Sequence, residues 1–515
     1  MKKASNVLTN FIHILFAVMV AIAIILDVFV AERVTYFAKK SFILPEIVML
    51  IIAAAMIANV AFLLRSRNSA NQSNKWINMA SVLLFLLLLY ISLSIYFIPG
   101  WDAGGVLDHA KQLIYNVIPD GEYYSIYPNQ RMILLVEYFI CRVNYYFGVL
   151  DSRDGLMMIV LVQCILFAAT GRILYAVIRD LLGNVYMAWA GWTLYCLMFA
   201  ISGWVVVPYT DALGVIFPVL IFRIYQLISE DNRPVRFAGW AAIAVLSYFG
   251  YKLKPMILVA AIAIVISELL SLAGELDKSK AKKRLINVAF VALIFIVVFA
   301  FSSSVFTKAF ARTGIVVDDN KNLGAMHMVM MGLNYGRDGS YLWDDVKMSK
   351  SIADPDERKT AQIQVIKERM NSYGFAGFMW HLARKAMVDF NDGSFAWGIE
   401  GDFYNVVLEE KNGKMCPRLR DFFYHTGDNY KYLLLVEQIL WLGTLILMSL
   451  CAFIKKNKLN TALTTASIGM FLFVLIFEAR ARYLIVFIPI FIVVAINGLD
   501  FICSGLNKSI KEKNI

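Results

Sequence analysis

Four short stretches of the chain combine charged side chains with residues that form turns. Two carry an acid, and two carry a pair of cations: Pro99-Gly100-Trp101-Asp102, Pro208-Tyr209-Thr210-Asp211, Gly250-Tyr251-Lys252-Leu253-Lys254-Pro255 and Glu478-Ala479-Arg480-Ala481-Arg482-Tyr483. A carboxylate can take a proton as a general base. Arginine binds phosphate through two parallel hydrogen bonds, and lysine binds it as a point charge. Together the stretches predict a site that pairs a base with an anionic ligand.

Each stretch also has a simpler explanation that the residues alone leave open. Asp102 can be a helix N-cap instead of a base. Asp211 can be a cap or a packing residue. The arginines can pair with Glu478, and the cations can contact lipid headgroups.

The amino-acid composition indicates the environment in which these stretches lie. Hydrophobic residues make up 60% of the 515 residues and charged residues only 17%, whereas soluble domains are nearer half apolar and a quarter charged. Apolar runs long enough to cross a bilayer recur along the chain, and in lipid they must be helices. We therefore expect an all-α polytopic membrane protein. The net charge of +11 comes from basic clusters between the runs, which orient membrane proteins, so no nucleic-acid partner is expected.

The apolar runs predict twelve spans with both termini in the cytoplasm. The spans cover about 10–31, 42–64, 77–98, 155–178, 185–201, 209–228, 237–250, 255–273, 286–306, 432–454, 460–477 and 483–503. The seventh is short and has a re-entrant element as its alternative. Lys and Arg gather in the short loops on one side, which is therefore cytoplasmic. The cations of 250–255 and 478–483 fall on the other side, which calls for an anionic partner there.

The spans divide the chain into five parts. These are N-terminal spans (1–98), a first extracytoplasmic loop (99–154), a central bundle (155–306), a large extracytoplasmic loop that partly folds as a small domain (307–431), and C-terminal spans with a cytoplasmic tail (432–515). The first loop holds two stretches typical of helices in the membrane interface. Asp108, Tyr127 and Arg131 lie on or between these stretches and are candidate substrate-binding residues, together with Asp211.

The sequence lacks the common motifs that bind cofactors. No phosphate-binding glycine loop, dinucleotide fingerprint or nucleophile motif occurs, and the histidines lack ligand-type spacing. Acidic pairs such as Asp318-Asp319 and Asp344-Asp345 could hold a divalent cation, but in a solvated loop they are more often surface residues. We therefore expect neither a cofactor nor a metal site, with a divalent cation at such a pair as the alternative.

These residues resemble the GT-C superfamily of membrane glycosyltransferases, which use polyprenyl-phosphate sugars. The nearer branch includes protein O-mannosyltransferases and bacterial aminoarabinose transferases. Trp101-Asp102 resembles the family's acidic residue at the start of the first outer loop, Gly250 to Pro255 its Gly-x-x-x-Lys-Pro turn, and Arg480 to Tyr483 its Arg-Tyr motif before the last span. Two spans precede the third here, whereas the family's first loop usually follows the first span.

The resemblance implies a GT-C-like bundle and a bacterial enzyme of the plasma membrane with an extracytoplasmic site. It would move a sugar from a polyprenyl-phosphate donor to an envelope glycan, lipid or protein, with inversion at the sugar carbon. Asp102 would be the general base. Arg480, Arg482, Lys252 and Lys254 would bind the donor phosphate.

Two other functions fit a membrane protein with charges at one face. One is a transporter or a flippase of lipid-linked sugars, which often has repeated halves and broken helices near the bilayer midplane. The other is an envelope polysaccharide polymerase or ligase with a lipid-pyrophosphate donor. No duplication is visible in this sequence, which favours glycosyl transfer over transport.

Overall fold

The part of the chain described by the computed structural model is entirely helical in its regular elements. It covers residues 2–30, 43–67, 69, 73–147, 152–228, 233–274, 278–401 and 415–513, and its elements are α-helices with short 3₁₀ and π segments. Within a bilayer this class is expected, because a helix pairs its backbone groups internally. The all-α membrane class expected from the sequence is confirmed.

Within the residues that the structure describes, ten helices are long and apolar enough to cross a membrane. Most of these ten helices coincide with a predicted span within a few residues. Two of the twelve predicted spans have no counterpart among the ten, and both are also helical. The predicted spans other than 185–201 correspond to α1 (Lys2–Phe29), α2 (Ile43–Leu64), α3 (Lys75–Ile95), α7 (Ser152–Leu182), α10 (Ile216–Leu227), α11 (Arg233–Leu253), α12 (Leu258–Ala273), α13 (Lys278–Ala311), α18 (Tyr430–Ser449), α19 (Lys458–Ile476) and α20 (Ile488–Lys513).

The two remaining predicted spans differ from the ten in apolar length. The apolar helix over Val185–Ala200 is shorter and consists of α8 (Val185–Tyr195) followed by the π segment η1 (Cys196–Ala200). A 3₁₀ turn, η2 (Gly203–Val206), and the short helix α9 (Thr210–Gly214) then lead into α10. The seventh predicted span is the middle of α11, whose ends carry Arg236 and Lys252.

Most of the other elements lie in the two long loops. They are α4 (Trp101–Ile114), α5 (Glu122–Ile126), α6 (Gln130–Tyr146), η4 (Asp319–Lys321), α14 (Gly324–Gly332), α15 (Trp343–Ser351), α16 (Pro355–Phe390), η5 (Trp397–Gly401), η8 (Pro417–Leu419) and α17 (Arg420–Phe423). Three 3₁₀ segments adjoin spans: η3 (Pro255–Ile257), η9 (Leu450–Phe453) and η10 (Ala481–Phe487).

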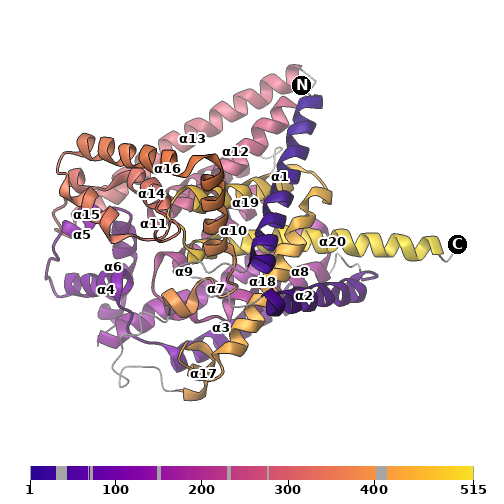
Figure 1. Ribbon diagram of the computed structural model, residues 1–515, viewed down its shortest axis with the longest axis horizontal. Coiled ribbons are helices and arrows are strands. Elements are labelled where there is room, and N and C mark those ends of the chain that lie inside the picture. Colours follow the sequence, from indigo (N-terminus) through magenta and orange to yellow (C-terminus); the bar gives the residue numbers. More distant parts are fainter. Residues whose placement is uncertain are drawn as a thin grey trace.

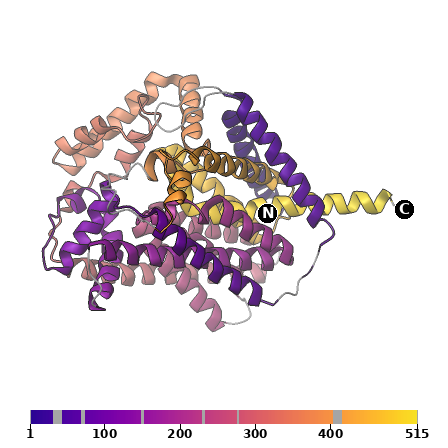
Figure 2. The same cartoon turned by 90° about the horizontal axis from the view of Figure 1, so that it is seen from below.

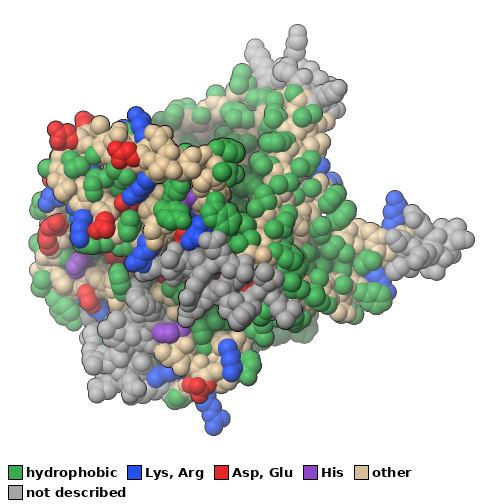
Figure 3. Space-filling view, in the orientation of Figure 1, with side chains coloured by type: hydrophobic (Ala, Val, Ile, Leu, Met, Phe, Trp, Pro, Cys, Tyr) green, Lys and Arg blue, Asp and Glu red, His purple; other side chains and the backbone are tan. Residues whose placement is uncertain are grey.

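The longer loop helices, α4, α6 and α14 to α16, gather at one end of the molecule. In Figure 1, α4 to α6 and α14 to α16 lie on the left, and the two ends of the chain lie at the upper right and far right. The view turned by 90° keeps α4 to α6 and the C-terminus at opposite sides (Figure 2). The space-filling view has many charged side chains over α14 to α16 and a mostly hydrophobic surface over the spans (Figure 3). The apolar surface is suited to lipid.

Helix α20 forms the centre of the bundle. It packs against α7, α8, α18 and α19, and most of its apolar window is buried. By contrast α13 lies at the edge, with Leu293, Ile296 and Phe301 exposed. An edge helix with an apolar outer face is suited to contact with lipid, which supports the membrane assignment.

The helices of the second long loop are held together by buried polar contacts. Arg358 donates hydrogen bonds to four backbone carbonyls. Arg369 pairs with Asp345 (2.6 Å), and Arg384 pairs with Asp338 (2.5 Å). Buried ion pairs fix relative orientation because removing one partner leaves an uncompensated charge. They therefore hold α14, α15 and α16 in one arrangement beside the membrane.

Candidate functional site

Three of the four charged stretches converge where α9, the end of α11 and the segment before α20 meet. Asp211 lies in the first turn of α9 and is buried. It accepts hydrogen bonds from Lys254 and from Arg482 Nη1, the latter at 3.0 Å. The two cations come from segments 43 and 271 residues away in the chain. The alternative of a plain helix cap does not describe Asp211, because its carboxylate serves two buried cations.

Arg480 and Arg482 share a second carboxylate. Glu400, in η5, accepts from Arg480 Nη1 at 2.8 Å and lies 2.5 Å from Arg482 Nε. Arg480 also pairs with Glu478 at 2.8 Å, and Glu478 accepts from the Tyr483 hydroxyl at 2.9 Å. Pairing of Arg480 with Glu478 was the simpler sequence interpretation, and it occurs within a larger network.

We call these six residues the charge cluster: Asp211, Lys254, Glu400, Glu478, Arg480 and Arg482. Three cations face three carboxylates, so the formal charges balance. Burial alone lowers the pKa of Arg480, but Glu400 and Glu478 raise it well above its usual range. Burial raises the pKa of Glu478, but Arg480 lowers it below the usual range. Each of these two groups therefore keeps its charge because the other is present.

The cluster also contacts two tyrosine rings. The Lys254 ammonium lies 4.4 Å from the centre of the Tyr483 ring, and the Arg482 guanidinium lies 5.1 Å from that of Tyr209. Such cation–π contacts are strongest where water is excluded. Burial, followed by Arg482, lowers the pKa of Lys254 well below its usual range, although Glu400 and Glu478 oppose this.

Asp102 lies beside this cluster and is exposed. It stands in the first turn of α4, directly after Trp101, whose φ of +53° is in the left-handed region. A bulky residue adopts that conformation only when its surroundings require it, and such residues are common at functional sites. The turn is tight, because a Cβ on Gly104 would come within 2.0 Å of the Pro99 carbonyl oxygen. The backbone therefore holds Asp102 in a defined position.

Tyr209 connects Asp102 to the charge cluster. Its hydroxyl donates to Asp102 Oδ2 at 3.4 Å and accepts from Gln130 Nε2 at 2.7 Å, while its ring contacts Arg482. Burial, together with Tyr209 and Asp102, raises the pKa of Tyr123, so this neighbouring phenol stays protonated. The exposed acid and the buried cations are thus separated by one tyrosine side chain.

The other predicted residues lie outside the charge cluster. Lys252, two residues before Lys254, contacts aromatic rings, among them Phe306 at 5.2 Å. Asp108 is exposed and lies 4.0 Å from Lys111 in the same helix. The structure therefore separates Lys252 from Lys254, although the sequence grouped them.

Tyr127 and Arg131 belong to the same long loop as Asp102. Tyr127 packs against Tyr123, with ring centres 5.5 Å apart. Arg131 donates to the Tyr124 carbonyl at 2.9 Å and pairs with the exposed Asp319 at 2.6 Å. These contacts order the tyrosine-rich segment.

Two further buried ionisable residues adjoin the cluster from α16. Lys385 donates to the Phe477 carbonyl at 2.5 Å, and burial lowers its pKa to about 8. Burial raises the pKa of Asp389 well above its usual range, although Lys385 and the Arg480 backbone oppose that. Lys385 stands in no motif that the sequence singled out.

In the described part of the chain, no group of three or more His, Cys, Asp or Glu side chains is arranged to hold a metal ion. Of the acidic pairs considered, Asp345 is bound to Arg369, and Asp344 lies 3.7 Å from Lys347. Asp318 caps η4.

The helices and their apolar surface define a polytopic integral membrane protein. The chain belongs to a family described as conserved hypothetical integral membrane proteins, whose sequence model matches residues 1–500. No curated protein matches the chain, and no solved structure matches it.

Proposed function

We propose that the protein is a membrane glycosyltransferase that takes a sugar from a polyprenyl-phosphate donor and passes it to an extracytoplasmic acceptor. The observation that supports this most is the placement of an exposed carboxylate, Asp102, next to a buried cluster with three cations. Tyr209 contacts both. Base and cations are the two groups that sugar transfer from a lipid phosphate needs.

Asp102 is the proposed general base. Its carboxylate would take the proton of the acceptor hydroxyl as that oxygen attacks the anomeric carbon. The hydrogen bond from Tyr209 orients the carboxylate, and Gln130 in turn fixes the Tyr209 hydroxyl. An acceptor can reach Asp102 because the residue is exposed.

Arg480, Arg482 and Lys254 are the proposed partners of the donor phosphate. The phosphate gains negative charge as the bond to the sugar breaks, and positioned donors stabilise that charge best when they need not reorganise. Asp211, Glu400 and Glu478 hold the three cations in place. A sugar with its phosphate is similar in length to a tyrosine side chain, so it could reach from Asp102 to the cluster.

A donor screen tests this proposal. The purified full-length protein in nanodiscs would be mixed with several polyprenyl-phosphate sugars and acceptor lipids or glycans, and release of polyprenyl phosphate would be measured. We expect release with at least one donor. Release only from polyprenyl-pyrophosphate donors would instead favour a polymerase or ligase.

The transport alternative needs a separate measurement. Proteoliposomes with a labelled lipid-linked sugar in one leaflet would report its movement to the other leaflet. Movement without chemical change, combined with no turnover of any donor, would overturn the proposal in favour of a flippase.

A further inference from the structure

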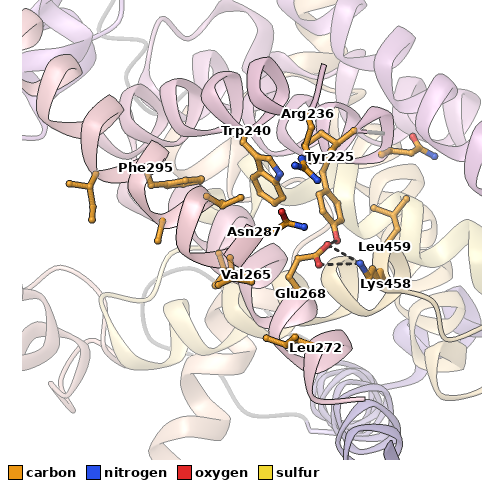
Figure 4. A pocket seen from close by; sticks show the side chains of 16 residues that line it. Tyr225, Arg236, Trp240, Val265, Glu268, Leu272, Asn287, Phe295, Lys458 and Leu459 are labelled. Carbon is orange, nitrogen blue, oxygen red and sulfur yellow. Dashed lines mark hydrogen bonds and ion pairs between the residues drawn. The ribbon is translucent and has the colours of Figure 1, made fainter. Parts of the chain in front are cut away.

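A cavity of about 580 Å³ lies among α10, α11, α12, α13 and α19, away from the charge cluster. This volume is within the range of about 300–1,000 Å³ that is usual for ligand sites. Its polar end holds Arg236, Glu268, Lys458 and Tyr225, as Figure 4 shows. Glu268 accepts from Tyr225 Oη at 2.6 Å and pairs with Lys458 at 3.1 Å.

The cavity continues into an apolar hollow of about 430 Å³ between α12 and α13. The two share Val265, Phe295 and Ile296. Only apolar side chains line the second hollow, which reaches Leu258 on α12 and Phe299 on α13. We call the two hollows together the groove.

The length of the groove matches one leaflet of a bilayer. From Glu268 to Leu258 the chain advances ten residues along α12, or about 15 Å at 1.5 Å per residue. One leaflet of hydrocarbon is about half of 30 Å. Ile296, on its wall, is 67% exposed and faces the region where lipid would lie. A chain of lipid can therefore enter from the side and lie along the groove.

Among the lining residues that the structure describes, the polar end has an excess of positive charge. Arg236 and Lys458 face one carboxylate there, that of Glu268, and no ion-pair partner of Arg236 is found among the described residues. Arg236 lies in the first turns of α11, and Lys458 begins α19, so both are at span ends where headgroups lie. One extra cation suits a headgroup with one net negative charge.

We propose that the groove binds a glycerophospholipid with one net negative charge, with its phosphate at Arg236 and an acyl chain along Val265 and Phe295. The charge at one end and the leaflet-length apolar wall distinguish this occupant from free phosphate and from an uncharged lipid. The proposal is independent of the glycosyltransferase proposal, because the groove and the charge cluster share no residue.

Lipid binding to the full-length protein can be measured by native mass spectrometry. The protein would be sprayed from detergent solutions that contain increasing concentrations of dioleoyl-phosphatidylglycerol. A second series would contain dioleoyl-phosphatidylcholine, which has the same chains and no net charge. We expect one tightly bound phosphatidylglycerol with about tenfold higher affinity than phosphatidylcholine, as one charge-assisted contact can supply.

Two groove variants and one control locate the lipid. Arg236→Gln should lower phosphatidylglycerol affinity about tenfold, and Val265→Trp should remove the bound lipid by filling the groove. Lys455→Gln, which removes an exposed cation from the loop before α19, should change the affinity less than about twofold. Melting temperatures of all three identify variants that fail to fold.

Three results would overturn the proposal. One is equal affinity for the two phospholipids. Another is equal loss in Arg236→Gln and Lys455→Gln. The third is displacement of phosphatidylglycerol by inorganic phosphate or by an equal concentration of polyprenyl phosphate, which would assign the groove to a different ligand.

Discussion

Replacing Asp211 by asparagine should destabilise the protein strongly, although the side chain hardly changes in volume. Asp211 is 1% exposed and contacts both Lys254 and Arg482. Asparagine keeps the shape but removes the charge, which leaves two buried cations with one carboxylate fewer. Removing one partner of a buried ion pair costs about 3–5 kcal/mol.

Asp319→Asn is a matched control for this variant. Asp319 also pairs with an arginine, Arg131, at 2.6 Å, but its side chain is 79% exposed. An exposed pair contributes about 0–1 kcal/mol. Each variant therefore removes one ion-paired carboxylate by the same chemical change. The two positions differ in burial.

Thermal unfolding of the purified protein, followed by tryptophan fluorescence, gives the comparison. We expect Asp211→Asn to lower the melting temperature by about 3–8 °C and Asp319→Asn by about 1 °C or less. Adding Lys254→Met to Asp211→Asn should restore part of the loss, because the unpaired cation is then gone. Equal melting temperatures for the two single variants would refute the reasoning about a buried, charge-balanced cluster.

Three further predictions concern other parts of the structure. Burial lowers the pKa of His327 to about 4, so its neutral form stabilises the fold at pH 7, and that contribution is lost below the unfolded value of about 6.5. Wild type should lose about 2 kcal/mol more than His327→Gln between pH 7 and pH 5, measured as unfolding free energy; parallel pH curves would contradict this. Gly203→Ala should cost about 1–3 kcal/mol in a melting assay, since its Cβ would lie 2.0 Å from the Trp397 ring; an unchanged melting temperature would show that the ring can move. Tyr209→Phe should lower kcat about two- to tenfold with little change in the donor KM, because it removes one hydrogen bond to Asp102, whereas a rise in KM alone would place Tyr209 in donor binding.

The membrane architecture was largely predictable from sequence, because apolar length is a direct consequence of bilayer thickness. The exceptions have physical causes. The span predicted over 185–201 ends in a π segment and a 3₁₀ turn, and its apolar helix is too short to count among the ten. Apolar composition alone does not report such a break. The short seventh run corresponds to a longer helix, α11, because its charged ends extend beyond the apolar part.

The candidate site was predictable only in part. Charges on the side opposite the basic loops indicated which stretches would gather, and Asp211, Lys254, Arg480 and Arg482 do meet. Glu400 was missed because it lies 80 residues from Arg480 and no local pattern marks it. A buried acid in a long loop becomes visible only when the fold places it against a cation.

Lys252 and Lys254 illustrate a second limit. Residues two positions apart in a helix point to nearly opposite sides, and α11 ends between them, at Leu253. A sequence that places both in one short turn does not determine which one turns inward. The structure places Lys254 against Asp211 and Lys252 against the Phe306 ring.

The most direct test of the proposed catalytic role is turnover by Asp102→Asn with a donor found in the screen. Asp120→Asn is the control, because Asp120 is an exposed acid of the same loop whose only described bond caps the Glu122 amide. Loss of a general base lowers the rate by about 10²–10⁴-fold. We predict that kcat falls by that factor in Asp102→Asn, with an unchanged melting temperature and normal turnover in Asp120→Asn. Turnover by Asp102→Asn at the wild-type rate would contradict the assignment of Asp102 as the base.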